Sequence, residues 1–165
     1  MLPDYYNSLD KINKKIWDML IDAIKNRHNP FHIPVFICGS KNKFDGRVVV
    51  LRGADKKNKT IKFHSDVRSN KIKIIKKNPS VSFLFYDKVE KIQLRLLGKA
   101  KINYKNYVTE ESWKKTAHMS RKCYLAETAP GTVNKNPTSG LKESIERFQY
   151  NMEESEIGYD HFSVI

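Results

Sequence analysis

The chain has 165 residues and a formal net charge of +13, from 31 basic and 18 acidic residues, and its hydrophobic fraction is 39%. These values are typical of a soluble globular protein of one domain, and no apolar run approaches the ~20 residues that a membrane span needs. The N-terminal MLPDYYNSLDK is acidic and aromatic, unlike a secretory signal. Cys38 and Cys123 are far apart and lack metal-ligand spacing, so we expect a reduced, cytoplasmic setting.

The first predicted element is a helix from about Leu9 to Asn26, because Ser8 is a candidate N-cap and apolar residues then recur at helical spacing. Segments rich in β-branched and aromatic residues follow. They predict three strands, over Ile33–Gly39, Arg47–Gly53 and Thr60–Ser65. Asp45-Gly46 is a hairpin signal, although the turn could equally lie at Ser40–Lys43.

The second half of the chain mixes strands and helices. The predicted strands are Val81–Asp87, Lys91–Ile102 and the final HFSVI, and the predicted helices are Ser69–Lys77, Thr109–Ser120 and Leu141–Glu154. A weak capping box, Thr109-Glu110-Glu111-Ser112, begins the middle helix, and the segment Ala129–Gly140 is rich in Pro, Gly and Asn and predicts a loop.

Closely spaced strands with hairpin turns favour an antiparallel sheet or barrel with added helices. We therefore expect a mostly β protein with peripheral helices. It would form one domain over residues 1–165, with an N-terminal helix in 1–30, a barrel core in 31–103, and a helical region and final strand in 104–165.

Hydroxyl and cationic side chains are concentrated where the third predicted strand meets the short helix. A helix N-terminus carries unpaired N–H groups and the positive end of the helix dipole, so it can bind an anion. Ser65 and Ser69 could donate hydroxyl groups there, Arg68 and Lys71 add charge, and Arg47 could reach the same place. An ordinary capped helix with solvated cations is the alternative, and the residues alone leave both readings open.

Two further patterns concern strands, along which successive side chains point to opposite faces with period two. Arg47 and Arg52 are five residues apart, so one regular strand would point them to opposite sides, where they could serve two phosphate groups. Gln93 and Arg95 would share a face opposite the apolar residues of their strand. That polar face suits a cofactor, and a solvated strand face is the alternative.

Four segments, R-V-V-V-L-R-G, F-H-S-D-V-R-S-N-K, N-P-S-V-S-F-L-F-Y and Q-L-R-L-L-G-K-A, occur in order between Ile33 and Gly140. Together they resemble the FMN-binding split-barrel family of pyridoxamine 5'-phosphate oxidase. The resemblance implies an antiparallel split β-barrel with peripheral helices, FMN as cofactor, and a homodimer with FMN at the subunit interface.

The resemblance also implies roles for individual residues. Arg47 matches the arginine that binds the FMN phosphate, and Gln93 matches the glutamine near the isoalloxazine ring. Asn70 stands where arginine is frequent in the family, and Arg68 could supply the missing positive charge. The implied FMN-binding residues are Arg47, Val48, Val49, Val50, Leu51, His64, Ser65, Arg68, Ser69, Asn70, Lys71 and Gln93. The implied substrate-binding residues are Arg52, Arg121 and Tyr124. No catalytic residue is assigned.

The expected function is that of an FMN-dependent oxidoreductase resembling pyridoxamine or pyridoxine 5'-phosphate oxidase, with a small phosphorylated substrate. The family's usual C-terminal continuation, with a Trp and an Arg-x-His-like segment, has no counterpart after HFSVI. This favours the alternative of a flavin-binding protein without oxidase activity, which could be a reductase, a stress-related protein or a flavin store.

A third hypothesis is a basic nucleic-acid-binding barrel, motivated by the charge and by Phe63, Phe83 and Phe85, on which bases could stack. It is the least favoured, because no RNP-type motif is present and Phe83 and Phe85 share a face typical of a core. A metal site is not expected, since Pro30 separates His28 from His32 and no Cys cluster is present. The sequence contains neither a dinucleotide-binding glycine motif nor a P-loop.

Overall fold

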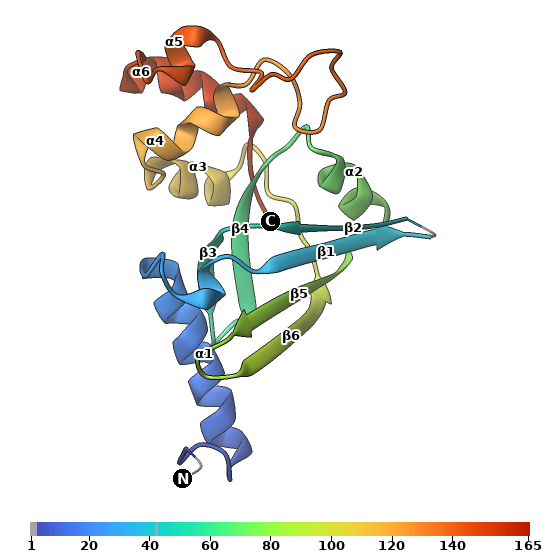
Figure 1. Cartoon of the computed structure of the whole chain (residues 1–165), viewed down its shortest axis with the longest axis vertical. Coiled ribbons are helices and arrows are strands. Elements are labelled where there is room, and N and C mark those ends of the chain that lie inside the picture. Colours follow the sequence, from blue (N-terminus) through green and yellow to red (C-terminus); the bar gives the residue numbers. More distant parts are fainter. Residues whose placement is uncertain (1–2, 42) are drawn as a thin grey trace. The chain divides into compact units, whose positions relative to one another are not determined.

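The computed structural model describes residues 3–41 and 43–165 (Figure 1). The chain divides into two compact units. The first, Met1–Phe63 with Ser80–Lys99, is called the sheet unit, and the second, His64–Pro79 with Ala100–Ile165, is called the helical unit. The prediction of one domain over the whole chain stays a prediction.

The sheet unit combines one long helix with antiparallel strands. Its elements are α1 (Leu9–Lys25), the 3-10 helix η1 (Pro30–His32), β1 (Val35–Ser40), β2 (Lys43–Val48), β3 (Leu51–Asp55), the first part of β4 (Thr60–Asp66), β5 (Ser80–Asp87) and β6 (Ile92–Lys99). Four strands form a sheet in the order β2-β1-β5-β6, and the beginning of β4 pairs with β3. This antiparallel arrangement with helices confirms the coarse fold prediction, whereas closure into a split barrel stays a prediction.

Helix α1 begins where the sequence predicts. The Ser8 side chain accepts a hydrogen bond from the Lys11 amide, and the helix ends when Asn26 adopts an extended conformation. Its apolar stripe buries Met19, Leu20 and Ala23, and the helix contacts β3. No helix among the described residues is long and apolar enough to cross a membrane.

Aromatic side chains form much of the core of the sheet unit. The Phe36 ring lies 4.9 Å from that of Phe63 and 5.2 Å from that of Phe83, and Phe31 lies 5.1 Å from Phe85. All five rings are buried, and tilted or edge-on pairs of this kind stabilise cores beyond their area alone. The prediction that Phe63, Phe83 and Phe85 offer stacking surfaces to nucleic acid bases is therefore wrong.

The segment Arg47–Gly53 is not one strand, as the sequence predicts, but the end of β2 and the beginning of β3. The ladder between β1 and β2 ends at the pair Val35↔Val48. Pro34 comes next on β1's side and has no N–H to continue the ladder, although its carbonyl accepts a bond from Val49 N at 3.0 Å. The chain then leaves this sheet and pairs Leu51 with β4, so the argument from alternation along one strand is wrong for Arg47 and Arg52.

The hairpin between β1 and β2 turns at the second of the two predicted places. Ser40 pairs with Lys43, and Lys41 in the turn has a positive φ of 51°, a conformation that tight turns require. Asp45 and Gly46 instead lie inside β2, so the turn predicted there is wrong. The register of the ladder, and not the local Asp-Gly pair, decides the position of the turn.

The helical unit holds mostly short helices. Its elements are the end of β4, α2 (Asn70–Lys77), α3 (Tyr107–Lys114), α4 (His118–Arg121), the 3-10 helix η2 (Lys122–Leu125), α5 (Glu143–Glu146), α6 (Met152–Ser155), the 3-10 helix η3 (Glu156–His161) and β7 (Phe162–Val164). The end of β4 pairs antiparallel with β7. Trp113, Tyr124, Phe162 and Val164 form a buried cluster in this unit.

The helices after β6 differ most from the sequence prediction. The capping box that begins α3 joins Asn106 to Thr109 and not Thr109 to Ser112, and α3 ends at Lys114 instead of continuing to Ser120. The predicted helix Leu141–Glu154 is two short helices, with Phe148 between them at a positive φ of 58°. Asn151 there caps α6, because an Asn side chain binds a helix's first N–H groups better than it fits a helix interior.

Candidate functional site

Three of the residues predicted to bind FMN phosphate lie together at the junction of β4 and α2 in the helical unit. Lys71 Nζ donates to Ser65 Oγ at 2.9 Å and to Ser69 Oγ at 3.1 Å, and the two hydroxyl oxygens are 3.2 Å apart. All three side chains are buried. We call Ser65, Ser69 and Lys71 the serine–lysine cluster.

Pairing between β4 and β7 positions this cluster. Ser65 lies opposite Ser163, whose hydroxyl donates to the Ser65 carbonyl at 2.7 Å. Ser69 precedes the first residue of α2, but its side chain makes no capping hydrogen bond to the helix. The Ser69 hydroxyl is instead directed to Lys71 and Ser65, so the alternative of an ordinary side-chain cap does not describe it.

Arg68 lies next to the cluster and has partners within the chain. Its backbone N–H and its guanidinium donate to the Asp66 carboxylate, with Nη2 at 2.7 Å, and Nη2 also donates to the Ala126 carbonyl at 2.9 Å. Arg68 thus connects Ala126, which follows η2, to the turn that holds the cluster. Its predicted role as a substitute charge at the phosphate stays a prediction.

The remaining predicted residues of the helical unit have varied surroundings. Asn70 is exposed at the beginning of α2. His64 is half-buried, with its ring edge-on to Phe162 at 4.7 Å. Tyr124 is buried and packs against Trp113 and Phe162.

Arg121, predicted to bind substrate, is 4% exposed and is surrounded by acceptors of the helical unit. Its Nη2 donates to the Trp113 carbonyl at 3.0 Å and its Nε to the Thr116 carbonyl at 3.1 Å. Its Nη1 donates to Ser155 and to the Glu156 carboxylate, and the guanidinium stacks on the Trp113 ring at 4.5 Å. These contacts give Arg121 a structural role, and its contact with substrate stays a prediction.

Glu156 completes the set of acceptors around Arg121. Its carboxylate accepts a hydrogen bond from Trp113 Nε1 at 2.7 Å and forms an ion pair with Arg121. The hydrogen bond from Trp113, followed by the contact with Arg121, holds the pKa of the Glu156 carboxyl below its ordinary value. Sequence reasoning missed Glu156, because no local pattern joins it to residues 35 positions earlier.

In the sheet unit, Arg47 lies on β2 and forms an ion pair with Asp45, two residues earlier on the same strand. Sequence reasoning missed Asp45 as a partner, although the period of two would have placed it on the same face. Arg52 is exposed on β3. Of the four residues between these two arginines, Val48 is exposed, Val50 is half-buried, and Val49 and Leu51 are buried.

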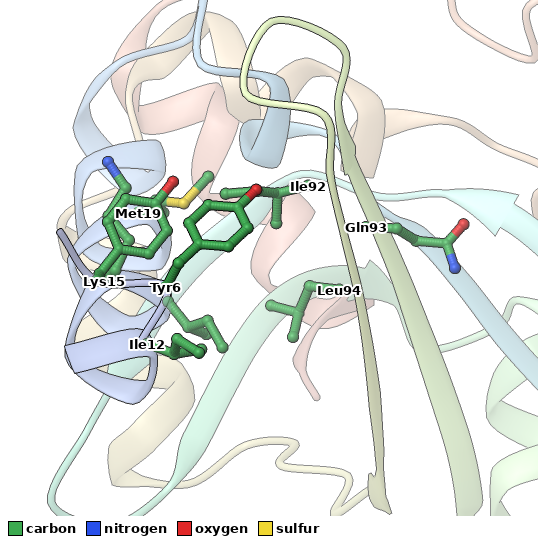
Figure 2. Close-up of a pocket in the computed structure, with 9 residues that line it drawn as sticks. Tyr6, Ile12, Lys15, Met19, Ile92, Gln93 and Leu94 are labelled. Carbon is green, nitrogen blue, oxygen red and sulfur yellow. The ribbon is translucent and has the colours of Figure 1, made fainter. Parts of the chain in front are cut away.

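Strand β6 has the two faces that the sequence predicts. Gln93 and Arg95 are exposed, and Ile92, Leu94 and Leu96 are half-buried on the opposite face. The apolar face lines a half-open cavity of about 210 Å³ with residues of α1. Figure 2 shows Ile92 and Leu94 directed toward that cavity and the Gln93 side chain directed away from it. A group bound by the Gln93 amide would therefore lie outside the cavity.

The comparisons with known proteins agree with this fold. The family model described as pyridoxamine 5'-phosphate oxidase, FMN-binding domain, matches residues 14–104, a little over half of the chain. No curated protein matches the sequence.

Two solved structures illustrate the similarity of fold. A pyridoxamine 5'-phosphate oxidase-related, FMN-binding protein from Nostoc punctiforme PCC 73102 has 16% identity and a TM-score of 0.64, over 99% of this chain and 80% of that one. PhzG from Burkholderia lata 383, in complex with tetrahydrophenazine-1-carboxylic acid, has 13% identity and a TM-score of 0.67, over 99% of this chain and 79% of that one. At such identities these structures support the fold alone. The family match covers β1 to β6 with the serine–lysine cluster between them, and the chain therefore belongs to the family of the pyridoxamine 5'-phosphate oxidase FMN-binding domain.

Proposed function

We propose that this protein is an FMN-dependent oxidoreductase in which the serine–lysine cluster binds the phosphate of the flavin. The observation that carries the proposal is the buried contact of the Lys71 ammonium with the two hydroxyl groups at the beginning of α2. An anion there would meet an ammonium, two hydroxyls and the first N–H groups of an eight-residue helix. Hydrogen bonds to charged groups are worth about 1.5–3 kcal/mol each, so these donors fit a phosphate.

The family pattern implies two further residues for the flavin, Arg47 for its phosphate and the exposed Gln93 amide for its ring. Strand register directs Arg47 and Gln93 to opposite faces of the four-stranded sheet, so we propose that the two residues of one copy serve different flavins. FMN, when bound, supplies the electron-transfer chemistry, and the side chains of the protein bind and orient it. Arg52, exposed on β3, is the residue that we propose for the phosphate of a substrate.

We further propose a homodimer that covers one face of the four-stranded sheet. Strand register places Val48, Leu84, Tyr86, Gln93 and Leu97 on this face, where Val48 is 59% and Leu97 is 85% exposed. Exposed apolar patches of this kind mark interaction sites. Because Gln93 lies among them, a second copy on this face would also enclose a flavin bound by that amide. Light scattering of the purified protein measures the oligomeric state, and a monomer at all concentrations contradicts the dimer.

The finer activity that we propose is oxidation of pyridoxamine or pyridoxine 5'-phosphate, in keeping with the family. Flavin binding without this activity, as in a reductase or a flavin store, is the second candidate. An assay that follows pyridoxal 5'-phosphate and peroxide separates them, because the oxidase forms both products and the second candidate forms neither.

The experiment that tests flavin binding is a titration of the flavin-free protein with FMN. We expect the wild type to bind FMN and Lys71→Ala to bind it about tenfold more weakly, about 1.4 kcal/mol. Lys73→Ala is the matched control, because Lys73 lies on the same helix but is exposed. A protein that is purified without a flavin spectrum and shows no response to FMN would contradict the cofactor. Equal affinities of the wild type and Lys71→Ala would remove Lys71 from the site.

A further inference from the structure

The arginine that matches the family's phosphate-binding position already has an anionic partner within its own strand. Arg47 Nη2 contacts the Asp45 carboxylate. Both residues face the same side of β2, since Phe36 lies opposite Arg47 and Cys38 lies opposite Asp45 on β1. The alternation of side chains along a strand therefore places the two charged groups next to each other on one face of β2.

The guanidinium of Arg47 is only partly satisfied by this contact. The Arg47 and Asp45 side chains are 32% and 23% exposed, so solvent and ligands reach both. Within residues 3–41 and 43–165, the buried Nε atom of Arg47 has no hydrogen-bond partner. Buried donors are normally paired, and a guanidinium offers five N–H donors in a fixed fork. Arg47 thus keeps donor capacity for a second acceptor while Asp45 offsets its charge.

We propose that Asp45 is an internal counterion that competes with the ligand phosphate for Arg47 and so limits how strongly the site distinguishes phosphorylated from unphosphorylated flavin. This inference rests on the proposed function, because it takes the FMN phosphate as the ligand of Arg47. A phosphate that approaches the guanidinium must displace the carboxylate or share the cation with it. In both cases repulsion between the two anions weakens binding.

A comparison of FMN with riboflavin isolates this effect, because riboflavin carries the same ring system without the phosphate. The titrations use the flavin-free full chain as wild type, Asp45→Asn, Arg47→Met and the double variant, and they follow the quenching of flavin fluorescence. Asp45→Asn keeps the shape of the side chain and removes its charge. Circular dichroism and thermal unfolding of each variant verify that it is folded, and Asp45→Ala serves as a second test of the same charge.

We expect Asp45→Asn to bind FMN about fivefold tighter, the upper end for a partly exposed ion pair, and to bind riboflavin with unchanged affinity. In the Arg47→Met background the Asp45→Asn change should give no further gain. If the folded Asp45 variants bind FMN no tighter than the wild type, the inference is wrong while flavin binding stands. If the gain is equal for riboflavin, the effect does not pass through the phosphate and the inference is also wrong. Failure of all four proteins to bind FMN would overturn the proposed function and this inference with it.

Discussion

Two arginines predicted to bind ligands, Arg47 of the sheet unit for the FMN phosphate and Arg121 of the helical unit for the substrate, have opposite surroundings. Arg121 is buried, and backbone carbonyls, a serine, a carboxylate and a tryptophan ring accept or cover its guanidinium. Arg47 is partly exposed, has a carboxylate partner and keeps a buried Nε atom with no partner among the described residues. The difference teaches that two arginines predicted from sequence to bind ligands can differ in exposure and in how many of their donors are paired, neither of which the sequence displays.

The largest expected effect is a loss of stability in Arg121→Met, which tests the structural side of this comparison. The substitution removes the side-chain donor from the carbonyls of Trp113 and Thr116 and breaks the ion pair with Glu156, so the free energy of unfolding should fall by about 3 kcal/mol. Chemical denaturation measures the loss. Arg147→Met is the control, because Arg147 forms an exposed pair with Glu143, and it should change stability by less than about 0.5 kcal/mol. An equally small loss for Arg121→Met would contradict its structural role.

A smaller effect is expected for Arg47→Met, and on binding instead of stability. Because Arg47 is partly exposed, stability should change by less than about 1 kcal/mol. Affinity for FMN should fall about tenfold, about 1.4 kcal/mol, while affinity for riboflavin stays the same. Fluorescence titration with both flavins measures this. A large loss of stability with unchanged FMN affinity would make Arg47 a structural residue like Arg121 and end the contrast between them.

The smallest expected effect is on the pH dependence of stability, and it is due to Glu156, the partner of Arg121. The pKa of Glu156 is lowered in the folded protein from its ordinary 4.5. The stabilisation is therefore present above that value and is lost as the pH falls through it toward the folded pKa. Since the Glu156 side chain is 54% exposed, the loss should be less than about 1 kcal/mol. Denaturation of the wild type and Glu156→Gln at several acidic pH values measures it, and parallel pH profiles of the two proteins would contradict this assignment.

Local signals predicted α1, β5, β6 and the serine–lysine cluster well. Ser8 caps α1 as expected, and the alternation along β6 places Gln93 and Arg95 on one face. The cluster could be anticipated because its members are close in sequence, at a strand end and the following helix start. The prediction of one strand over Arg47–Gly53 was wrong because its valines suit any strand. The lack of an N–H on Pro34 decides where the ladder between β1 and β2 ends. The prediction of one helix over Leu141–Glu154 was wrong because helical spacing in a short stretch does not reveal a break at Phe148.

The sequence by itself determined the antiparallel character of the fold, the long first helix, the family and the grouping of hydroxyl and cationic residues at the beginning of α2. These features depend on neighbours within a few positions, or on an order of segments that can be read directly. Tertiary structure alone decided which cations keep donors for a ligand. Satisfaction of a guanidinium depends on groups that folding brings from distant positions, as Glu156 is brought to Arg121, or on the register that sets Asp45 beside Arg47 on the face of a paired strand.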